Sequence, residues 1–313
     1  MKPSRIVFPG FWFGQSDIKQ AEQFAEQGVG GFCVYGATAR EMLDFSRRMN
    51  EISPYGRLLF CADVAEDLSE IIKDAPALPK NHALFNSQTT DAAYRKGNSL
   101  GRLARAVGID WVLAPVVDLG YKSPSLSEDL MTVVRLAGDM TAGLSNAGAL
   151  SCIKYFPGIS GALKTLAQLE DAEFVPYKNL FRRTDAVMPS DMSFPNLDDN
   201  AQAMLSDKVI KGLLRKRLNY KGCIVSFPLS RAKLRYEEAS AIKMLHAGVE
   251  IILSPRNAAG VIDAITHEIN RGLLTDAITQ TISDIEMFIS KVASGPEPDT
   301  FDKACELARK AFE

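Results

Sequence analysis

Short runs of apolar residues alternate with longer amphipathic stretches along almost the whole chain of 313 residues. Each run is four to seven residues long, which is typical of a β-strand that is buried on both faces. Eight runs of this kind occur, at residues 5–8, 30–35, 58–63, 111–116, 149–155, 186–189, 222–226 and 249–254.

The stretches between the runs repeat their apolar residues with a period of about 3.6, which predicts amphipathic helices. Ser16 is the expected N-cap of the first helix, and Gly28 its expected end. Glycines also end three later stretches, just before the next strand. The five stretches are 16–28, 39–52, 87–108, 127–148 and 236–248.

Eight strands that are each followed by a helix or a loop predict an α/β protein with a parallel sheet. An eightfold count within one domain of roughly 250 residues favours a TIM-like (β/α)8 barrel over a doubly wound sheet. From about residue 275 the pattern is helical, at 277–292 and 301–312, with a linker-like segment at 294–299. We therefore predict a barrel domain at 1–293 and a C-terminal helical tail at 294–313 that packs on the barrel.

The composition narrows the class of protein. A formal net charge of −2 provides no field that would attract nucleic acid or an acidic membrane surface. No window of about 18 uninterrupted apolar residues occurs, so we expect no membrane span. The five cysteines stand singly, which indicates a reducing compartment and therefore a cytoplasmic protein. The three histidines are scattered and no phosphate-binding glycine motif follows a strand, so we expect neither a metal nor a cofactor.

Polar residues follow several of the predicted strands, at the end where a parallel barrel forms its site. Asp63, Asp118 and Asp191 follow the third, fourth and sixth strands, and Lys154 and Tyr155 end the fifth. Carboxylates and a lysine at one mouth suit a ligand rich in hydroxyl groups. The alternative is that Asp63 and Asp118 only cap the helices that follow them. Lys154 lies in line with an apolar strand, so it needs a partner if it is buried.

Seven segments together are similar to a known family of proteins. They are GVGGFCVYG (28–36), LLFCADVAED (58–67), LGRLARAVGIDWVLAPVVDLG (100–120), IKYFPGISG (153–161), DAVMPSDM (185–192), LLRKRLNYKGCIVSFPLS (213–230) and MLHAGVEIILSP (244–255). In this order they resemble glycoside hydrolase family 3, and most closely its cytoplasmic single-domain β-N-acetylglucosaminidases. The resemblance covers roughly residues 5 to 290.

The resemblance implies a role for several residues. It implies that Asp63 and Lys154 bind hydroxyls of the sugar in the central subsite, and that Asp118 and Met188 shape the pocket. Tyr155, Ile159 and Asp191 stand where the family has histidines, so we expect Tyr155 and Asp191 among the substrate-binding residues.

Two departures from the family pattern concern the catalytic residues. Phe227 stands at the position of the nucleophilic aspartate, which in a retaining family forms the glycosyl-enzyme intermediate. The loop after Gly158 contains no histidine, whereas the β-N-acetylglucosaminidases have their acid/base histidine there. We therefore predict a degenerate, non-catalytic member that binds an amino sugar, a cell-wall fragment or a protein partner.

Two alternatives stay open. One is an active O-glycosyl hydrolase with a rewired site that uses Asp191, Glu66 or Asp67 as its carboxylates. The other is a structural or regulatory subunit whose barrel mouth is filled by Phe227, Tyr155 and Ile159.

Overall fold

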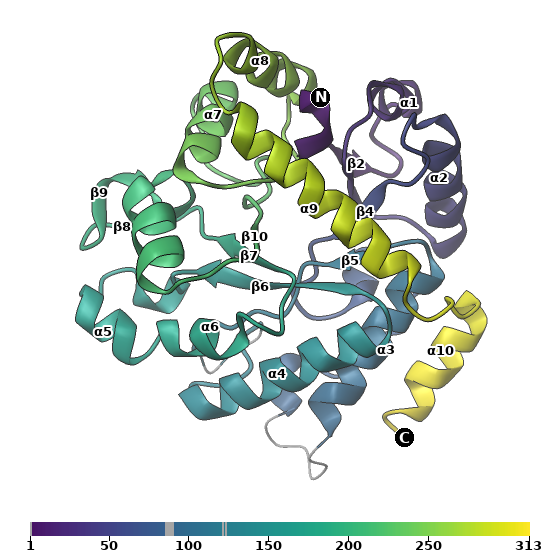
Figure 1. Ribbon diagram of the computed structural model, residues 1–313. Coiled ribbons are helices and arrows are strands. Elements are labelled where there is room, and N and C mark those ends of the chain that lie inside the picture. Colours follow the sequence, from purple (N-terminus) through teal and green to yellow (C-terminus); the bar gives the residue numbers. More distant parts are fainter. Residues whose placement is uncertain (1, 85–90, 121, 123) are drawn as a thin grey trace.

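The computed structural model describes residues 2–84, 91–120, 122 and 124–313, and the strands form the predicted parallel barrel (Figure 1). Seven strands follow one another in the order β2-β3-β4-β5-β6-β7-β10, and β1 pairs with β11. A bridge between Val225 and Ile251 joins β10 to β11. The barrel strands are β1 (Val7–Phe8), β2 (Gly10–Trp12), β3 (Gly31–Tyr35), β4 (Leu59–Ala62), β5 (Trp111–Val112), β6 (Leu150–Phe156), β7 (Ala186–Pro189), β10 (Cys223–Ile224) and β11 (Ile252–Leu253).

The first barrel strand differs from the predicted run at 5–8. Pro3–Ile6 forms a 3-10 helix, and the strand continues past the predicted end as far as Trp12 in two pieces. Pro9, which separates β1 from β2, has no N–H to donate to a ladder. On either side of it, β1 pairs with β11 and β2 pairs with β3, so this interrupted strand closes the ring.

The predicted helices are confirmed, with shifts of a few residues at their ends, and residues 87–90 of the third prediction lie outside the described residues. The N-cap of the first helix is Asp17 and not Ser16: the Asp17 carboxylate accepts from the Lys19 N–H, while the Ser16 hydroxyl accepts from the Trp12 N–H. The helices are α1 (Ile18–Gln27), α2 (Ala39–Ile52), α3 (Ala92–Ala106), α4 (Leu130–Asn146), α5 (Leu166–Asp171), α6 (Phe174–Leu180), α7 (Glu237–Ala247), α8 (Ala258–Asn270), α9 (Thr275–Ala293) and α10 (Phe301–Lys310).

Several smaller elements complete the chain. An antiparallel hairpin of β8 (Ser193–Phe194) and β9 (Asp198–Gln202) follows β7 and was not predicted from the sequence. A π-helix, Lys208–Arg217, lies between this hairpin and β10 in the chain. Short 3-10 helices lie at Leu68–Glu70, Asn81–Leu84, Ile159–Gly161 and Ala203–Leu205.

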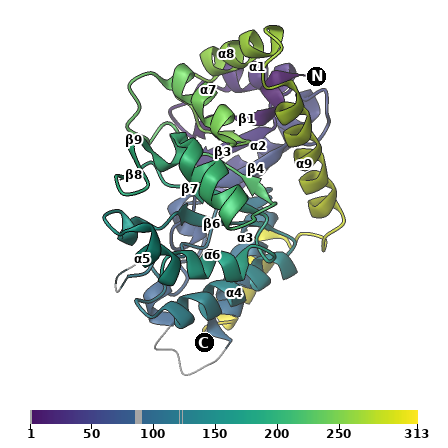
Figure 2. The ribbon, with the colours of Figure 1, turned by 60° about the vertical axis from the view of Figure 1, so that its left-hand side comes forward.

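Helix α9 closes the end of the barrel at which the strands begin. Phe288 of α9 packs against Trp111 inside the barrel, with 5.3 Å between the ring centroids. Arg5, just before β1, pairs with Glu286 of α9 at 2.7 Å, and Asp185, just before β7, pairs with Lys291. Figure 2 shows α9 on one side of the barrel and the β8–β9 hairpin on the opposite side. The polar residues that follow the strands are therefore left at the other end.

The last helix, α10, lies against α3. The Arg95 guanidinium donates to the Ala311 carbonyl at 2.6 Å, and Arg102 pairs with Asp299 at 2.5 Å. The predicted helices of the tail are thus confirmed, while the division into domains at 293/294 stays a prediction. Among the described residues, no helix has both the length and the apolar composition needed to cross a membrane.

Candidate functional site

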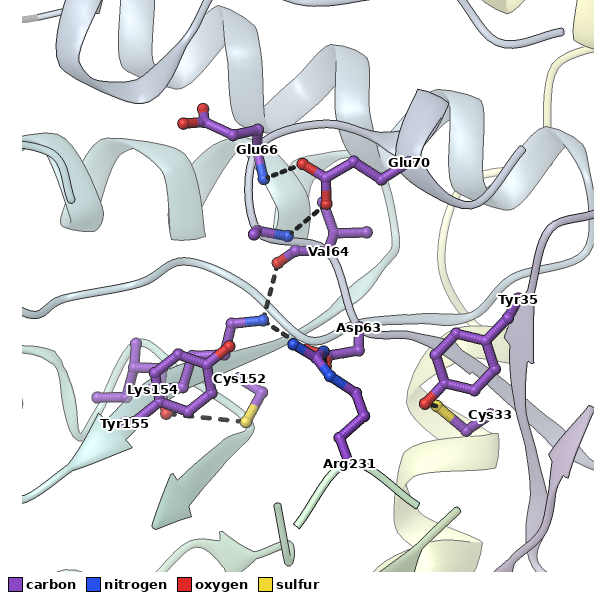
Figure 3. A network of polar contacts seen from close by, with 12 residues as sticks. Cys33, Tyr35, Asp63, Val64, Glu66, Glu70, Cys152, Lys154, Tyr155 and Arg231 are labelled. Carbon is purple, nitrogen blue, oxygen red and sulfur yellow. Dashed lines mark hydrogen bonds and ion pairs between the residues drawn. The ribbon is translucent and has the colours of Figure 1, made fainter. Parts of the chain in front are cut away.

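A buried ion pair lies where β4 and β6 end (Figure 3). The Lys154 ammonium is 2.7 Å from Oδ1 of Asp63 and donates to the Val64 carbonyl at 2.8 Å. The two side chains are 0% and 1% exposed, so Lys154 has the partner that a buried lysine requires. Burial alone would lower the pKa of Lys154, but the charge of Asp63 outweighs it and holds that pKa above its usual value.

A second cation, Arg231, reaches the same carboxylate from the loop after β10. It pairs with Oδ2 of Asp63 at 2.5 Å, and its own side chain is 54% exposed. Asp63 therefore lies between one buried and one half-exposed cation. Arg231 was not predicted from the sequence, because it lies five residues beyond the predicted strand at 222–226 and not directly after it.

Asp118 holds the backbone of the loop after β6. Its two oxygens accept from the N–H groups of Ile159, at 2.8 Å, and Tyr155, at 3.4 Å. Burial raises the pKa of Asp118 to about 7, although the two backbone bonds oppose the rise. The capping alternative is wrong for Asp63 and for Asp118. The helices that follow them are capped by Asp67 and Asp129.

Aromatic and cationic side chains surround the end of β10. The rings of Tyr155 and Phe227 are 5.7 Å apart at an angle of 54°. The Arg231 guanidinium lies 5.6 Å from the Phe227 ring, and the Lys154 ammonium 5.3 Å from the Tyr155 ring. Of the three residues proposed to fill the mouth, Tyr155 and Phe227 thus meet, while Ile159 is 38% exposed.

The remaining predicted site residues lie at different depths. Met188 is fully buried in the apolar interior of the barrel, in register with Lys154. Asp191 is partly buried, and this burial raises its pKa, while the neighbouring cations Arg231 and Lys233 act in the opposite direction. Asp191 therefore lies at the mouth beside Arg231, and Met188 lies below it.

One oxygen of Glu66 and the carboxylate of Asp67 are engaged elsewhere, while Oε1 of Glu66 is buried without a hydrogen-bond partner among the described residues. Oε2 of Glu66 accepts from the Asn81 N–H at 2.7 Å and lies 3.5 Å from the buried Lys96 ammonium. Asp67 accepts from the N–H and hydroxyl of Ser69. In Figure 3 the Glu66 carboxylate points away from Lys154. The structure therefore does not bring Glu66 or Asp67 together with the Asp63–Lys154 pair.

A further buried acid, Glu173, was not predicted from the sequence, because it stands in a polar segment that contains other acids. Its carboxylate accepts from the Lys164 ammonium at 2.6 Å and from the Ser160 hydroxyl at 3.2 Å. It also lies close enough to Asp118 to contribute to the raised pKa of that carboxyl, after the larger effect of burial. Within the described ranges, no group of three histidine, cysteine or acidic side chains could hold a metal ion.

The comparison with known proteins identifies the family. Residues 14–285 match the N-terminal domain of glycosyl hydrolase family 3, and the chain belongs to this family. The β-N-acetylglucosaminidase of Paenibacillus sp. has the same fold, with a TM-score of 0.83 over 99% of this chain and 67% of that one, at 22% identity. The predicted barrel is therefore confirmed.

Curated relatives carry the name β-hexosaminidase. The protein of Idiomarina loihiensis is 26% identical over 216 residues, which are 62% of this chain and 65% of that protein. The protein of Nitrosospira multiformis is 29% identical over 194 residues, 55% of each chain. The chain thus spans between about half and two thirds of the length of these relatives.

Proposed function

We propose that the protein binds an amino sugar, free or as part of a cell-wall saccharide, at the end of the barrel where the strands end and does not cleave it. The observation that carries the proposal is Phe227, which stands where the family resemblance expects the nucleophilic aspartate. A phenyl ring has no lone pair with which to attack a sugar, so the step that forms the glycosyl-enzyme intermediate has no agent at this position.

Asp63 pairs with Arg231, which lies beside the Phe227 ring, but Asp63 does not replace the missing nucleophile. Asp63 is shared between Lys154 and Arg231, and both of its oxygens accept hydrogen bonds from cations. Because both oxygens are engaged in these hydrogen bonds, neither is free to attack the anomeric carbon of a sugar. This carboxylate is suited to holding hydrogen-bond donors.

The same groups support the binding of a sugar. The relatives' name, β-hexosaminidase, points to amino sugars as the ligand class. The half-exposed Arg231 guanidinium can donate to sugar oxygens, and Tyr155 and Phe227 offer aromatic rings on which the apolar face of a pyranose can pack. A protein partner is the alternative to a sugar ligand. The cytoplasmic location of the protein stays a prediction.

Titration of the pure protein with N-acetylglucosamine and its β-1,4-linked dimer, followed by calorimetry or NMR, tests the proposal. The wild type is expected to bind, and Arg231→Gln to bind about tenfold more weakly, because one charge-assisted hydrogen bond is lost. Arg40→Gln is the matched control, since Arg40 is exposed on α2. An absence of binding at millimolar sugar, or equal binding by all three proteins, contradicts the proposal. An absence of binding would favour the regulatory subunit with a filled mouth.

One observation favours a second function, hydrolysis by a rewired site. Asp191 is partly buried at the mouth, and its raised pKa is a property that a general acid needs. Turnover that is lost in Asp191→Ala would establish this function in place of the first.

A further inference from the structure

A cleft with a volume of about 350 Å³ lies beside the mouth, between the β8–β9 hairpin and α7. The hairpin contributes Ser193 and Gln202 to its lining, the loop after β10 contributes Lys233 and Arg235, and α7 contributes Lys243. This volume is within the range of sites that bind small molecules, roughly 300–1,000 Å³. The hairpin and α7 can be followed in Figures 1 and 2.

The lining of the cleft has a surplus of positive charge. Lys233, Arg235 and Lys243 carry one positive charge each, and Asp199 is the one acid among the described residues that line the cleft. No ion pair joins any of the three cations to a carboxylate in the part of the chain that the structure describes. The Arg235 guanidinium instead lies 5.1 Å from the Tyr236 ring. Three positive charges and one negative charge give the lining a surplus of two positive charges, and Asp191, which neighbours Lys233, lies outside the lining.

Gln202, which lines the cleft, has a buried side-chain oxygen that lacks a hydrogen-bond donor in the described part of the chain. The side-chain nitrogen of Gln202 donates to the Lys233 carbonyl at 3.5 Å. Its oxygen Oε1 is buried and has no hydrogen-bond partner within the described ranges. Buried polar atoms are nearly always paired, so this oxygen needs a donor. The phosphate of a monoester is mostly a dianion at pH 7 and then has no hydrogen to donate, whereas a sugar hydroxyl has one.

We propose that this cleft binds a phosphorylated sugar, with the phosphate at the three cations and a hydroxyl at Oε1 of Gln202. A phosphate monoester carries a charge of about −1.5 to −2 at pH 7, which matches the surplus of two charges better than the single charge of a carboxylate does. The cleft is separate from the Asp63–Lys154 pair, and Lys233 follows Arg231 by two residues on the same loop. The proposal does not depend on sugar binding at the mouth.

Titration with N-acetylglucosamine 6-phosphate, N-acetylglucosamine and inorganic phosphate tests the proposal. The phosphorylated sugar is expected to bind the wild type at least about tenfold more tightly than either of the other two, because it alone satisfies both the cations and Gln202. Lys243→Gln should remove at least half of this advantage. Lys216→Gln, on an exposed lysine of the segment Lys208–Arg217, should leave it unchanged.

Two further variants test the hydroxyl contact apart from the phosphate contact, and test whether the cleft binds independently of the barrel mouth. Gln202→Ala should weaken the binding of the phosphorylated sugar more than it weakens the binding of inorganic phosphate. Arg231→Gln should leave the advantage of the phosphorylated sugar intact, since it acts on the mouth. Equal affinity for the sugar with and without phosphate, or no effect of Lys243→Gln, overturns the proposal. Glucuronate binding as tightly as the phosphorylated sugar overturns the assignment of phosphate.

Discussion

The substitution Asp63→Asn removes one charge from the buried pair and keeps the shape of the side chain. The Lys154 ammonium then stays in a site with 0% exposure and without a compensating charge. Removing one partner of a buried ion pair costs about 3–5 kcal/mol of stability. The Val64 carbonyl, 2.8 Å from the ammonium, and the new amide oxygen still accept hydrogen bonds, so we expect a loss near the lower limit, about 3 kcal/mol. Arg231 contributes little to this loss, because it is half exposed and can turn to water.

The loss should depend on pH in a direction that identifies Lys154 as its source. In the variant, burial acts without the opposing charge of Asp63, so the pKa of Lys154 falls below the unfolded value of about 10.4. Between the two values the unfolded chain binds more protons than the folded one, and stability rises with pH. The deficit relative to the wild type should therefore shrink as the pH is raised from about 7 to 10.

Urea denaturation followed by fluorescence and circular dichroism at several pH values measures these effects. Adding Lys154→Met to Asp63→Asn removes the unpaired charge, so the double variant should be more stable than Asp63→Asn alone. Lys310→Met is the control, because Lys310 and its partner Glu306 are exposed on α10. A loss below about 1 kcal/mol in Asp63→Asn, or a double variant less stable than the single one, refutes the reasoning.

Three further predictions concern other parts of the molecule. Asp118→Asn should reduce the fall in melting temperature that accompanies a rise in pH from about 4 to about 7. Over this range the folded protein holds a proton on Asp118 that the unfolded chain has lost. Identical pH profiles of variant and wild type would count against this prediction. Phe288→Ala should cost about 3–5 kcal/mol in urea denaturation, since Phe288 fills the closed end of the barrel. The neighbouring Met287 is 57% exposed, so Met287→Ala should cost much less stability than Phe288→Ala. Equal losses of stability would show that α9 does not close the barrel. Phe227→Asp combined with Pro228→Asp should not hydrolyse an unactivated glycoside, because the loop after β6 has no histidine to protonate the leaving group; efficient turnover by this variant would reveal an acid that the account lacks.

The fold was predictable from the sequence because strands buried on both faces leave continuous apolar runs. The run at 149–155, for example, lies within one residue of β6 at each end. The interrupted first strand was not predictable in the same way. Its second piece, Gly10–Trp12, lies beyond Pro9, and a proline is ordinarily a sign that a strand has ended. Ring closure by β1 and β2 depends on long-range pairing, which local patterns do not encode.

The candidate site was predictable only in part. Lys154 stood out because a lysine in an apolar run has few explanations, and the structure pairs it with Asp63. Arg231 and Glu173 lie in polar loop segments of ordinary composition, where their charge has no contrast with the surroundings. Only the folded chain brings Arg231 back to Asp63, 168 residues earlier in the sequence.

Release of fluoride from N-acetylglucosaminyl β-fluoride tests the central claim most directly. Fluoride leaves with little protonation, so this substrate needs no general acid and responds to any carboxylate that can attack or activate water. Under the proposed function Phe227 stands at the position of the nucleophile, and Asp63 is held by two cations, so we expect a rate equal to the protein-free background. A rate that rises in proportion to the concentration of pure protein, and that Asp191→Ala abolishes, would contradict it.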